Sequence, residues 1–428
     1  MRRLLIALAF LLCTTSVWAQ REVTPQQAND EVNDYISRGD YVTLSRELPA
    51  VREMIVPHLL KLADAFVAYS EGRHEESNQH IAELEQYRKE LGDGVIITMQ
   101  NIAYYNALAV EDYAAASRYL TTLIEAAPSQ RATLEAFKGW MDALADREPV
   151  AIKTTKRKNS FPVESRAVGD GLHLMVEATV GRESVDMIFD TGCCNANCIT
   201  AEAAERLGVR ILVDSLPLGG VGGETYAKVG VLPKMKVGDV VVKNPTFFVL
   251  ESIVDNPSMK VEAVLGTHVI RAMGEMKIDL EQNIITLPAE QSEPQSRNLS
   301  FHQGNYGIDF SYDGMPLVAH LDTGRVKSDL SQRFYGYFPA MVDSTAGERI
   351  KSSRSGVGGS REYEIVRLPL ITLNVADRAV TFGNVDVITA GHPSAWDGVM
   401  GADLLKANMT RPLRDSGQWV VNDLVLRA

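Results

Sequence analysis

The stretch Met187-Ile188-Phe189-Asp190-Thr191-Gly192 is an apolar run that ends in a carboxylate, a hydroxyl and a glycine. An aspartate at the end of a buried strand needs a partner for its polar group. The same triplet, Asp-Thr-Gly, occurs again at residues 322–324, after a mostly apolar run at 316–321. One copy is typical of an ordinary exit from a strand into a turn. Two copies suggest that Asp190 and Asp322 are partners.

The neighbourhood of each triplet repeats the same landmarks in the same order. A glycine-rich segment begins 30 residues after Asp190 (220 − 190) and 34 residues after Asp322 (356 − 322). A Leu-Pro pair and then two apolar residues with a glycine follow in both halves. The matching segments are Gly220-Val221-Gly222-Gly223 with Gly356-Val357-Gly358-Gly359, Leu232-Pro233 with Leu368-Pro369, and Val264-Leu265-Gly266 with Val399-Met400-Gly401. This agreement predicts an internal duplication.

Short alternating strands with glycine turns are predicted from Phe161 to the end of the sequence. In both halves a strand and a tight turn lead into the Asp-Thr-Gly segment. A polar segment at 289–300 separates the halves and is predicted to be a linker. We therefore predict an all-β lobe at 161–288 and a second at 301–428, each long enough to form its own core.

The N-terminal third has a different pattern, and residues 24–148 are predicted to be helical. Apolar residues recur there at spacings of three and four, and polar breaks occur near Gly39, Gly72 and Glu111. The breaks are 33 and 39 residues apart (72 − 39 and 111 − 72), a period similar to that of tetratricopeptide repeats. Such repeats could present a concave surface to a protein partner, or the helices could simply pack on the neighbouring domain. The basic residues 149–160 are predicted to be a linker.

The first nineteen residues resemble a secretory signal peptide. Arg2 and Arg3 precede an apolar run at 4–12, and Ala19 is the small residue that cleavage requires. The run is too short to span a bilayer, and no later stretch is long and apolar enough. Without the two arginines the formal net charge changes from −12 to −14, which argues against a nucleic-acid partner. We expect an exported, periplasmic or extracellular chain with no membrane span after cleavage.

Two facing carboxylates have a definite chemistry. Asp190 and Asp322 at close range would share one proton, because two adjacent negative charges repel. One could then act as general base on a bound water, while the other donates a proton to a carbonyl. Gly192 and Gly324 would let the turns approach closely. The hydroxyls of Thr191 and Thr323 could form hydrogen bonds across the symmetry axis.

From about Phe161 onward the chain resembles the retropepsin-like aspartic proteases, duplicated within one chain as in the pepsin-like enzymes. The resemblance covers about 270 of 428 residues. It implies a pair of β-barrel lobes with Asp190 and Asp322 as catalytic residues and no metal or cofactor. The glycine-rich segments at 220–223 and 356–359 would be flaps over a peptide or protein substrate, and self-association would not be needed to complete the site.

The sequence departs from this family pattern in three places. The residue after each triplet is normally small and uncharged, whereas here Cys193 and Arg325 occur. Arg325 would favour two ionised carboxylates if it points at the pair, and would have no effect if it points to solvent. His320 stands where an apolar residue is expected, and we interpret it as a core histidine bonded to the backbone. Two other hypotheses therefore stay open: an inactive peptide-binding pseudo-peptidase, and a scaffold protein that acts through its helices.

Three cysteines lie close together after the first triplet, at 193, 194 and 198. Three thiols in one cluster do not make a disulfide framework, although one pair could form a bridge. A zinc site would need a fourth ligand, so small residues packed beneath a turn are the preferred interpretation. The segment at 220–223 is no dinucleotide-binding motif, because a strand rather than a helix follows it.

Overall fold

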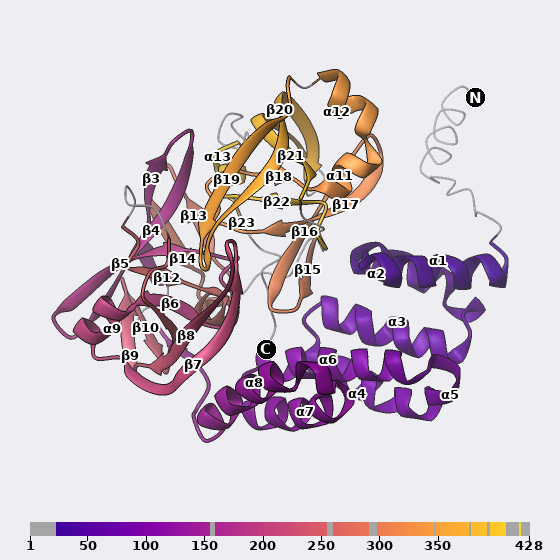
Figure 1. Cartoon of the computed structure of the whole chain (residues 1–428), viewed down its shortest axis with the longest axis horizontal. Coiled ribbons are helices and arrows are strands. Elements are labelled where there is room, and N and C mark those ends of the chain that lie inside the picture. Colours follow the sequence, from indigo (N-terminus) through magenta and orange to yellow (C-terminus); the bar gives the residue numbers. More distant parts are fainter. Residues whose placement is uncertain are drawn as a thin grey trace, which may run out of the picture.

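A computed structural model describes residues 23–154, 159–254, 260–290, 298–345, 347–375, 378–391, 394–407 and 419–420. The predicted signal peptide lies outside these ranges, as does most of the predicted linker between the lobes. The chain has a helical N-terminal region followed by a β-rich region (Figure 1), so the predicted order is confirmed. None of the described helices is both long enough and apolar enough to span a membrane.

The N-terminal region is a series of helices in which consecutive helices pack against each other. They are α1 (Pro25–Arg38), α2 (Tyr41–Val51), α3 (Pro57–Ser70), α4 (His74–Glu83), α5 (Arg88–Leu91), α6 (Asp93–Ala109), α7 (Tyr113–Ala126) and α8 (Arg131–Leu144). Short 3-10 turns occur at Arg52–Met54, Leu84–Tyr87 and Pro128–Gln130.

The predicted breaks fall where helices end. Gly39, Gly72 and Glu111 all have positive φ angles, of 72°, 72° and 58°. This left-handed conformation ends a helix by turning the chain away from its axis. The side chains of Asp40 and Asp112 then accept hydrogen bonds from backbone amides at the start of α2 and α7. The local sequence therefore sets the helix boundaries, and the tetratricopeptide class of the repeats stays a prediction.

The first β unit consists of a large sheet and two short helices. Its strands follow the order β1-β10-β9-β4-β5-β12-β6-β11-β8-β7, and β3 pairs with the first half of β4 outside this order. Their bounds are β1 (Ala151–Lys153), β3 (Glu164–Val168), β4 (Gly171–Val180), β5 (Glu183–Phe189), β6 (Asn197–Thr200), β7 (Arg210–Gly220), β8 (Gly223–Val231), β9 (Lys234–Val237), β10 (Val240–Lys243), β11 (Thr246–Leu250) and β12 (Ala263–Leu265). The helices are α9 (Ala201–Leu207) and α10 (Thr267–Met273).

The second β unit has a sheet of order β15-β16-β17-β22-β18-β21-β20-β19. Its elements are β15 (Leu299–His302), β16 (Asn305–Tyr312), β17 (Met315–Leu321), β18 (Asp329–Leu330), β19 (Ile350–Gly356), β20 (Gly359–Val375), β21 (Arg378–Ala390), β22 (Gly398–Met400), α11 (Gln332–Tyr337), α12 (Pro339–Thr345) and α13 (Asp403–Ala407). The series from β16 to β19 has the same order and the same strand directions as β4-β5-β12-β6-β11-β8-β7 in the first unit.

A third sheet joins segments that are far apart in the sequence. Its order is β2 (Asn159–Pro162), β14 (Ile284–Leu287), β13 (Lys277–Asp279) and β23 (Trp419–Val420). Part of the predicted linker at 149–160 therefore forms strands, since β1 pairs with β10 and β2 begins at Asn159. The isolated basic residues there gave no strand pattern, and the partner strands lie about a hundred residues further along the chain.

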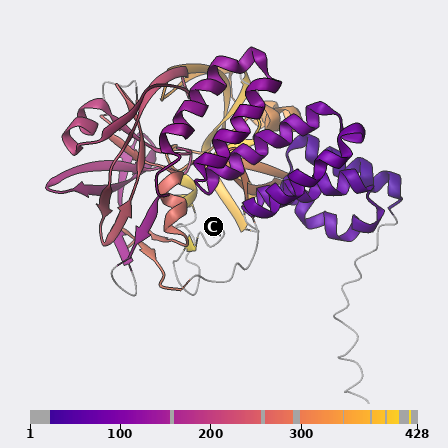
Figure 2. The same cartoon turned by 90° about the horizontal axis from the view of Figure 1, so that it is seen from below.

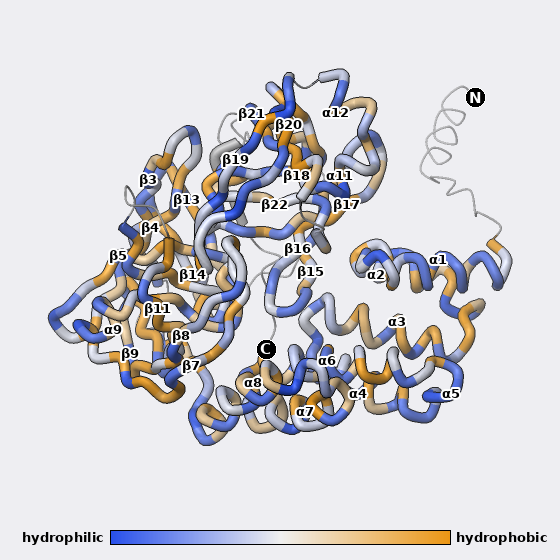
Figure 3. The backbone as a smooth tube through the Cα atoms, in the orientation of Figure 1, coloured by the Kyte–Doolittle hydropathy of each residue, from blue (hydrophilic) through white to orange (hydrophobic). Residues whose placement is uncertain are grey.

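The helical region packs on both β units, and Figure 2 shows the helices lying against them. Helices up to α6 share one hydrophobic core with the second unit, where Tyr69 meets Phe301 edge to face at 5.6 Å. Residues of α6, α7 and α8 share another core with the first unit, where Trp140 meets Phe248 at 5.3 Å. In Figure 3 the inner α3 is largely hydrophobic and the outer α1 largely hydrophilic. The helices are therefore an integral part of the fold.

A buried hydrogen bond supports this packing, in which Nδ1 of His268 donates to Glu111 while Nε2 of His268 accepts from the Thr246 amide (3.1 Å). Glu111, between α6 and α7, has its Oε1 atom 2.8 Å from Nδ1 of His268 on α10. Its other oxygen accepts hydrogen bonds from the Tyr113 hydroxyl (3.1 Å) and the Val150 amide (2.7 Å). Burial acts to raise the pKa of Glu111, but His268, the Val150 amide and Arg271 outweigh it and hold this pKa below its ordinary value.

We predict that Glu111→Gln lowers the unfolding free energy at neutral pH by about 1–3 kcal/mol, because the glutamine side chain accepts hydrogen bonds at one end only and leaves a buried donor unpaired. The pKa of Glu111 is lowered in the fold, so its contribution is present at neutral pH and is lost as pH falls through that pKa. Denaturant unfolding at pH 7 and at about pH 4 should therefore show a smaller difference at acid pH. Glu135→Gln, which removes an exposed pair with Arg131, is the matched control. Equal unfolding midpoints for the two variants would refute the prediction.

Candidate active site

The two Asp-Thr-Gly loops face each other at the junction of the β units. Strand β5 leads into Asp190, whose amide donates to Leu265 O (3.0 Å) on the neighbouring β12. Strand β17 leads into Asp322, whose amide donates to Met400 O (2.9 Å) on β22. The segments 264–266 and 399–401 therefore pass beside the loops and fix the direction in which each strand ends.

Close approach of the loops depends on the glycines. A Cβ atom on Gly192 would overlap the carboxyl group of Asp322, and one on Gly324 would overlap the carboxyl group of Asp190. Each carboxyl group thus packs directly against the backbone of the opposite loop. Only glycine leaves room for this contact.

The threonines hold the loops together through four reciprocal hydrogen bonds. The amide of Thr191 donates to Oγ1 of Thr323 (3.1 Å), and the amide of Thr323 donates to Oγ1 of Thr191 (3.0 Å). Each hydroxyl then donates to a carbonyl on the opposite strand, Thr191 to Leu321 O and Thr323 to Phe189 O, both at 2.8 Å. Both side chains are buried, so water does not compete for these bonds.

The aspartates are in contact with each other and with backbone amides. Oδ1 of Asp190 accepts from the amides of Gly192 (2.7 Å) and Cys193 (3.0 Å), and Oδ1 of Asp322 accepts from the amide of Arg325 (3.1 Å). Burial raises the pKa of Asp190 well above its ordinary value, and the neighbouring Asp322 raises it further, which outweighs the two amides. Asp190 therefore keeps a proton to higher pH than an ordinary aspartate.

Arg325 directs its charge away from the two aspartates. Its guanidinium forms an ion pair with Asp329, a buried carboxylate on β18. Arg354 on β19 lies 3.1 Å from the same carboxylate oxygen. The backbone amide of Arg325 donates to Oδ1 of Asp322, as the Cys193 amide donates to Oδ1 of Asp190. Residue 325 thus contributes its backbone to one carboxylate and its side chain to another.

His320 is partly buried, and its Nε2 atom is enclosed. It stacks on Trp396 with ring centroids 5.7 Å apart and an angle of 17° between the ring planes. Burial lowers the pKa of His320, even though Asp322 acts in the opposite direction. Its Nε2 atom has no hydrogen-bond partner among the described residues. The core location agrees with the interpretation from sequence, but the ring is held by stacking rather than by a bond from Nε2 to the backbone.

The three cysteines lie beside the first loop. The Sγ atoms of Cys193 and Cys198 are 3.5 Å apart, and the Cys193 carbonyl accepts from the amide of Thr267 (2.8 Å). The hydrogen bond with Cys198 and burial raise the pKa of Cys193, which keeps its thiol protonated. Among the described residues, no three His, Cys, Asp or Glu side chains are grouped to hold a metal ion.

The two glycine-rich segments form hairpin tips that meet each other. The β7–β8 tip carries Gly220 to Gly223, and the β19–β20 tip carries Gly356 to Gly359. The amide of Gly222 donates to Val357 O (3.2 Å) of the other tip. A Cβ atom on Gly220 would overlap the backbone of Val357. Figure 1 shows the hairpins converging between the β units.

A cavity of about 480 Å³ contains the aspartates and the hairpin tips in its lining. The helical region contributes four aromatic side chains to this lining: Tyr104, Tyr105, Phe137 and Trp140. Sequence analysis missed this role, although Tyr105 belongs to the three/four spacing that predicts an apolar helix face. The spacing identifies the face but does not reveal that part of it borders the cavity.

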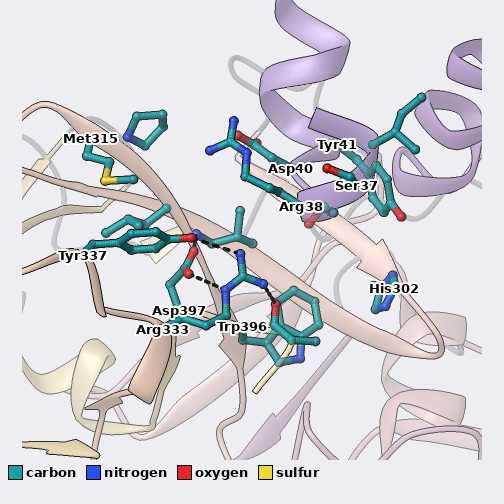
Figure 4. A pocket seen from close by; sticks show the side chains of 17 residues that line it. Ser37, Arg38, Asp40, Tyr41, His302, Met315, Arg333, Tyr337, Trp396 and Asp397 are labelled. Carbon is teal, nitrogen blue, oxygen red and sulfur yellow. Dashed lines mark hydrogen bonds and ion pairs between the residues drawn. The ribbon is translucent and has the colours of Figure 1, made fainter. Parts of the chain in front are cut away.

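A second pocket, of about 260 Å³, lies between the α1–α2 turn and the second β unit (Figure 4). Arg333 crosses it, with Nε 3.2 Å from Oδ1 of Asp397 and Nη1 donating to Ala395 O (2.7 Å). Arg38 and Asp40 line the side formed by the helices. Among the described residues, it shares no lining residue with the larger cavity. The charged residues in the described lining of this pocket are two arginines and two aspartates. Because its lining comes from both the helices and the second unit, the pocket is part of the contact between them.

Comparison with known proteins finds one family match over part of the chain and solved structures of low similarity. Residues 176–269, from β4 into α10, match the family model described as aspartyl protease. The solved structure of an aspartic proteinase from Irpex lacteus is similar at 10% identity and a TM-score of 0.37, covering 58% of this chain and 92% of that one. A retropepsin-like aspartic protease from Rickettsia conorii is similar at 19% identity and a TM-score of 0.22, covering 32% and 94%. No curated protein sequence matches significantly.

We predict that Thr191→Val destabilises the junction of the loops. It leaves the Thr323 amide without its acceptor and the Leu321 carbonyl without one of its donors, at about 1–3 kcal/mol for each unsatisfied buried group. Thr191→Ser keeps the hydroxyl and is the control. Denaturant unfolding of the two variants measures the difference. A valine variant as stable as the serine variant would contradict this role of the hydroxyl.

Proposed function

We propose that the chain is an exported aspartic-type endopeptidase that hydrolyses peptide bonds with a water activated between Asp190 and Asp322. The observation that carries this proposal is the contact between two equivalent Asp-Thr-Gly loops, in which each carboxyl group packs on the opposite glycine. The family match over residues 176–269 gives independent support, because it includes the first loop and the first hairpin. The exported location rests on the predicted signal peptide.

The chemistry follows from the shared proton. With one proton on the pair, the ionised carboxylate accepts a proton from the water as the water attacks the peptide carbonyl. The protonated carboxyl donates to the carbonyl oxygen, so charge does not build up on the tetrahedral intermediate. The threonine hydrogen bonds keep the carboxyls in place while protons move, and the hairpin tips cover an extended substrate.

We further propose that the two β units arose by internal duplication and form the two lobes of the enzyme. The shared order of seven strands supports this, as do the sequence landmarks. The direction of Arg325 favours an enzyme over an inactive relative, since its guanidinium pairs with Asp329 on β18. The helices would be a fixed part of the enzyme rather than an independent scaffold domain, because they share hydrophobic cores with both β units.

We predict that Asp190→Asn and Asp322→Asn each abolish cleavage of an unfolded protein substrate, with a loss of at least about 10³-fold. Digestion followed by gel electrophoresis and mass spectrometry would measure this. The matched control is Asp186→Asn, an exposed carboxylate on β5 that pairs with Arg166. A rate unchanged in either loop variant would exclude the mechanism.

The pH dependence follows from the raised pKa of Asp190. Because that pKa lies well above its ordinary value, the shared proton is kept at acid pH and lost as pH rises through it. We therefore expect kcat/KM to fall on the alkaline side as this proton dissociates. A rate profile from about pH 3 to pH 9 would test it. Activity that rises steadily with pH would show that the active form is fully ionised.

A further inference from the structure

The cavity above the two aspartates has two chemically different walls. One is formed by the first β unit together with α6 and α8, and the other by the second β unit. An extended peptide alternates the direction of its side chains, so neighbouring residues would meet different walls. The side chains on the two walls therefore influence which peptide sequences fit the cavity.

The first wall is apolar and aromatic. Phe248, Ile188 and Val264 come from the first unit, and Trp140 packs on Phe248 with ring centroids 5.3 Å apart. Phe137, from the same helix as Trp140, is only partly buried and also lines the cavity. Away from Asp190, these apolar and aromatic side chains suit a large apolar or aromatic side chain of a substrate.

The second wall carries two arginines, Arg325 and Arg354. The side chain of Arg354 is only 15% exposed, and its Nε atom has no hydrogen-bond partner among the described residues. Asp329 and Asp386 lie 3.1 Å and 3.8 Å from Nη2 of Arg354, yet neither is among the described residues that line the cavity. Arg325 and Arg354 thus border the cavity, whereas the carboxylates that pair with them are not part of its described lining. A buried donor without a partner favours an acceptor supplied by a ligand.

Equivalent positions in the two halves account for this difference. Arg325 and Cys193 each come three residues after their aspartate, and Arg354 and Leu218 each come two residues before the first glycine of their hairpin tip. The first unit thus has small or apolar side chains where the second has arginines. The strand order is the same in both units, so at these positions the difference lies in the side chains, and the aromatic residues of α6 and α8 add to it.

Building on the proposed peptidase function, we propose that the preferred substrates are peptides with a large apolar or aromatic side chain on one side of the cleaved bond and an aspartate or glutamate side chain on the other. The aromatic wall, to which the helices contribute, would hold the first. The carboxylate of the second would form charge-assisted hydrogen bonds with Arg354 and Arg325.

The acidic preference is tested with end-capped peptides that are identical except for Glu or Gln at the varied position. For the wild type we expect a kcat/KM ratio of Glu to Gln peptide of about tenfold or more, and for Arg354→Leu a ratio near one. Arg354→Lys should keep a preference for Glu because it retains a cation. Lys351→Leu removes an exposed charge from the same strand, outside the cavity lining, and should leave the ratio unchanged. A wild-type ratio near one, or equal ratios in wild type and Arg354→Leu, would overturn the arginine assignment.

The aromatic wall is tested through Phe137→Ala. We expect the preference for peptides with phenylalanine over those with alanine at the apolar position to fall about fivefold to tenfold. Lys138→Ala, which removes an exposed ion pair from the same helix, is the matched control. A phenylalanine preference that survives unchanged in Phe137→Ala would show that the helix takes no part in selecting substrate.

Binding separates this inference from the peptidase proposal. Fluorescence anisotropy with labelled peptides and the Asp190→Asn variant measures selection without cleavage. Tighter binding of the apolar-acidic peptide than of its Gln counterpart, lost when Arg354→Leu is added, would support the inference even if the wild type cleaves nothing. Equal binding of both peptides would refute it even if the wild type is an active peptidase.

Discussion

The close approach of two carboxyl groups is the constraint on which the rest of the site depends. Asp190 and Asp322 belong to different β units, so the approach requires a precise junction between the units. Glycine at 192 and 324 provides the space, and the threonine hydrogen bonds fix the separation. Two buried carboxyls without such support would repel each other when ionised and lose solvation. Burial raises the pKa of Asp190, and the neighbouring Asp322 raises it further.

The helical region contributes to this junction from outside. Its first helices share a core with the second unit, and its last helices share a core with the first. A region that packs on both units limits how far they can move apart. The same arrangement brings α6 and α8 to the edge of the cavity, so that stabilising the junction and shaping the cavity are two results of one packing arrangement.

The sequence predicts those features that local rules control. The Asp-Thr-Gly triplets, the hairpin glycines and the helix breaks are visible because turns and close approaches restrict the residue type. Features set by distant side chains are not visible in this way. The direction of Arg325 depends on Asp329, whose position beside it follows from the pairing of β18 with β21 and β22. In the same way, strand β1 in the predicted linker requires the edge of β10, which no local pattern announces.

The two halves agree at some positions and differ at others. Positions that define the backbone, such as the loop glycines, the cross-bonding threonines and the hairpin tips, have the same residue in both halves. The loop glycines leave the space for the contact between the loops, and the threonine hydroxyls form its hydrogen bonds. Positions whose side chains only border the cavity are free of this constraint. The second unit can have Arg325 at the position equivalent to Cys193 because the Arg325 amide still donates to Asp322. The Arg325 guanidinium forms an ion pair with Asp329. A symmetric backbone can therefore carry an asymmetric cavity, and in this protein the asymmetry lies in charge.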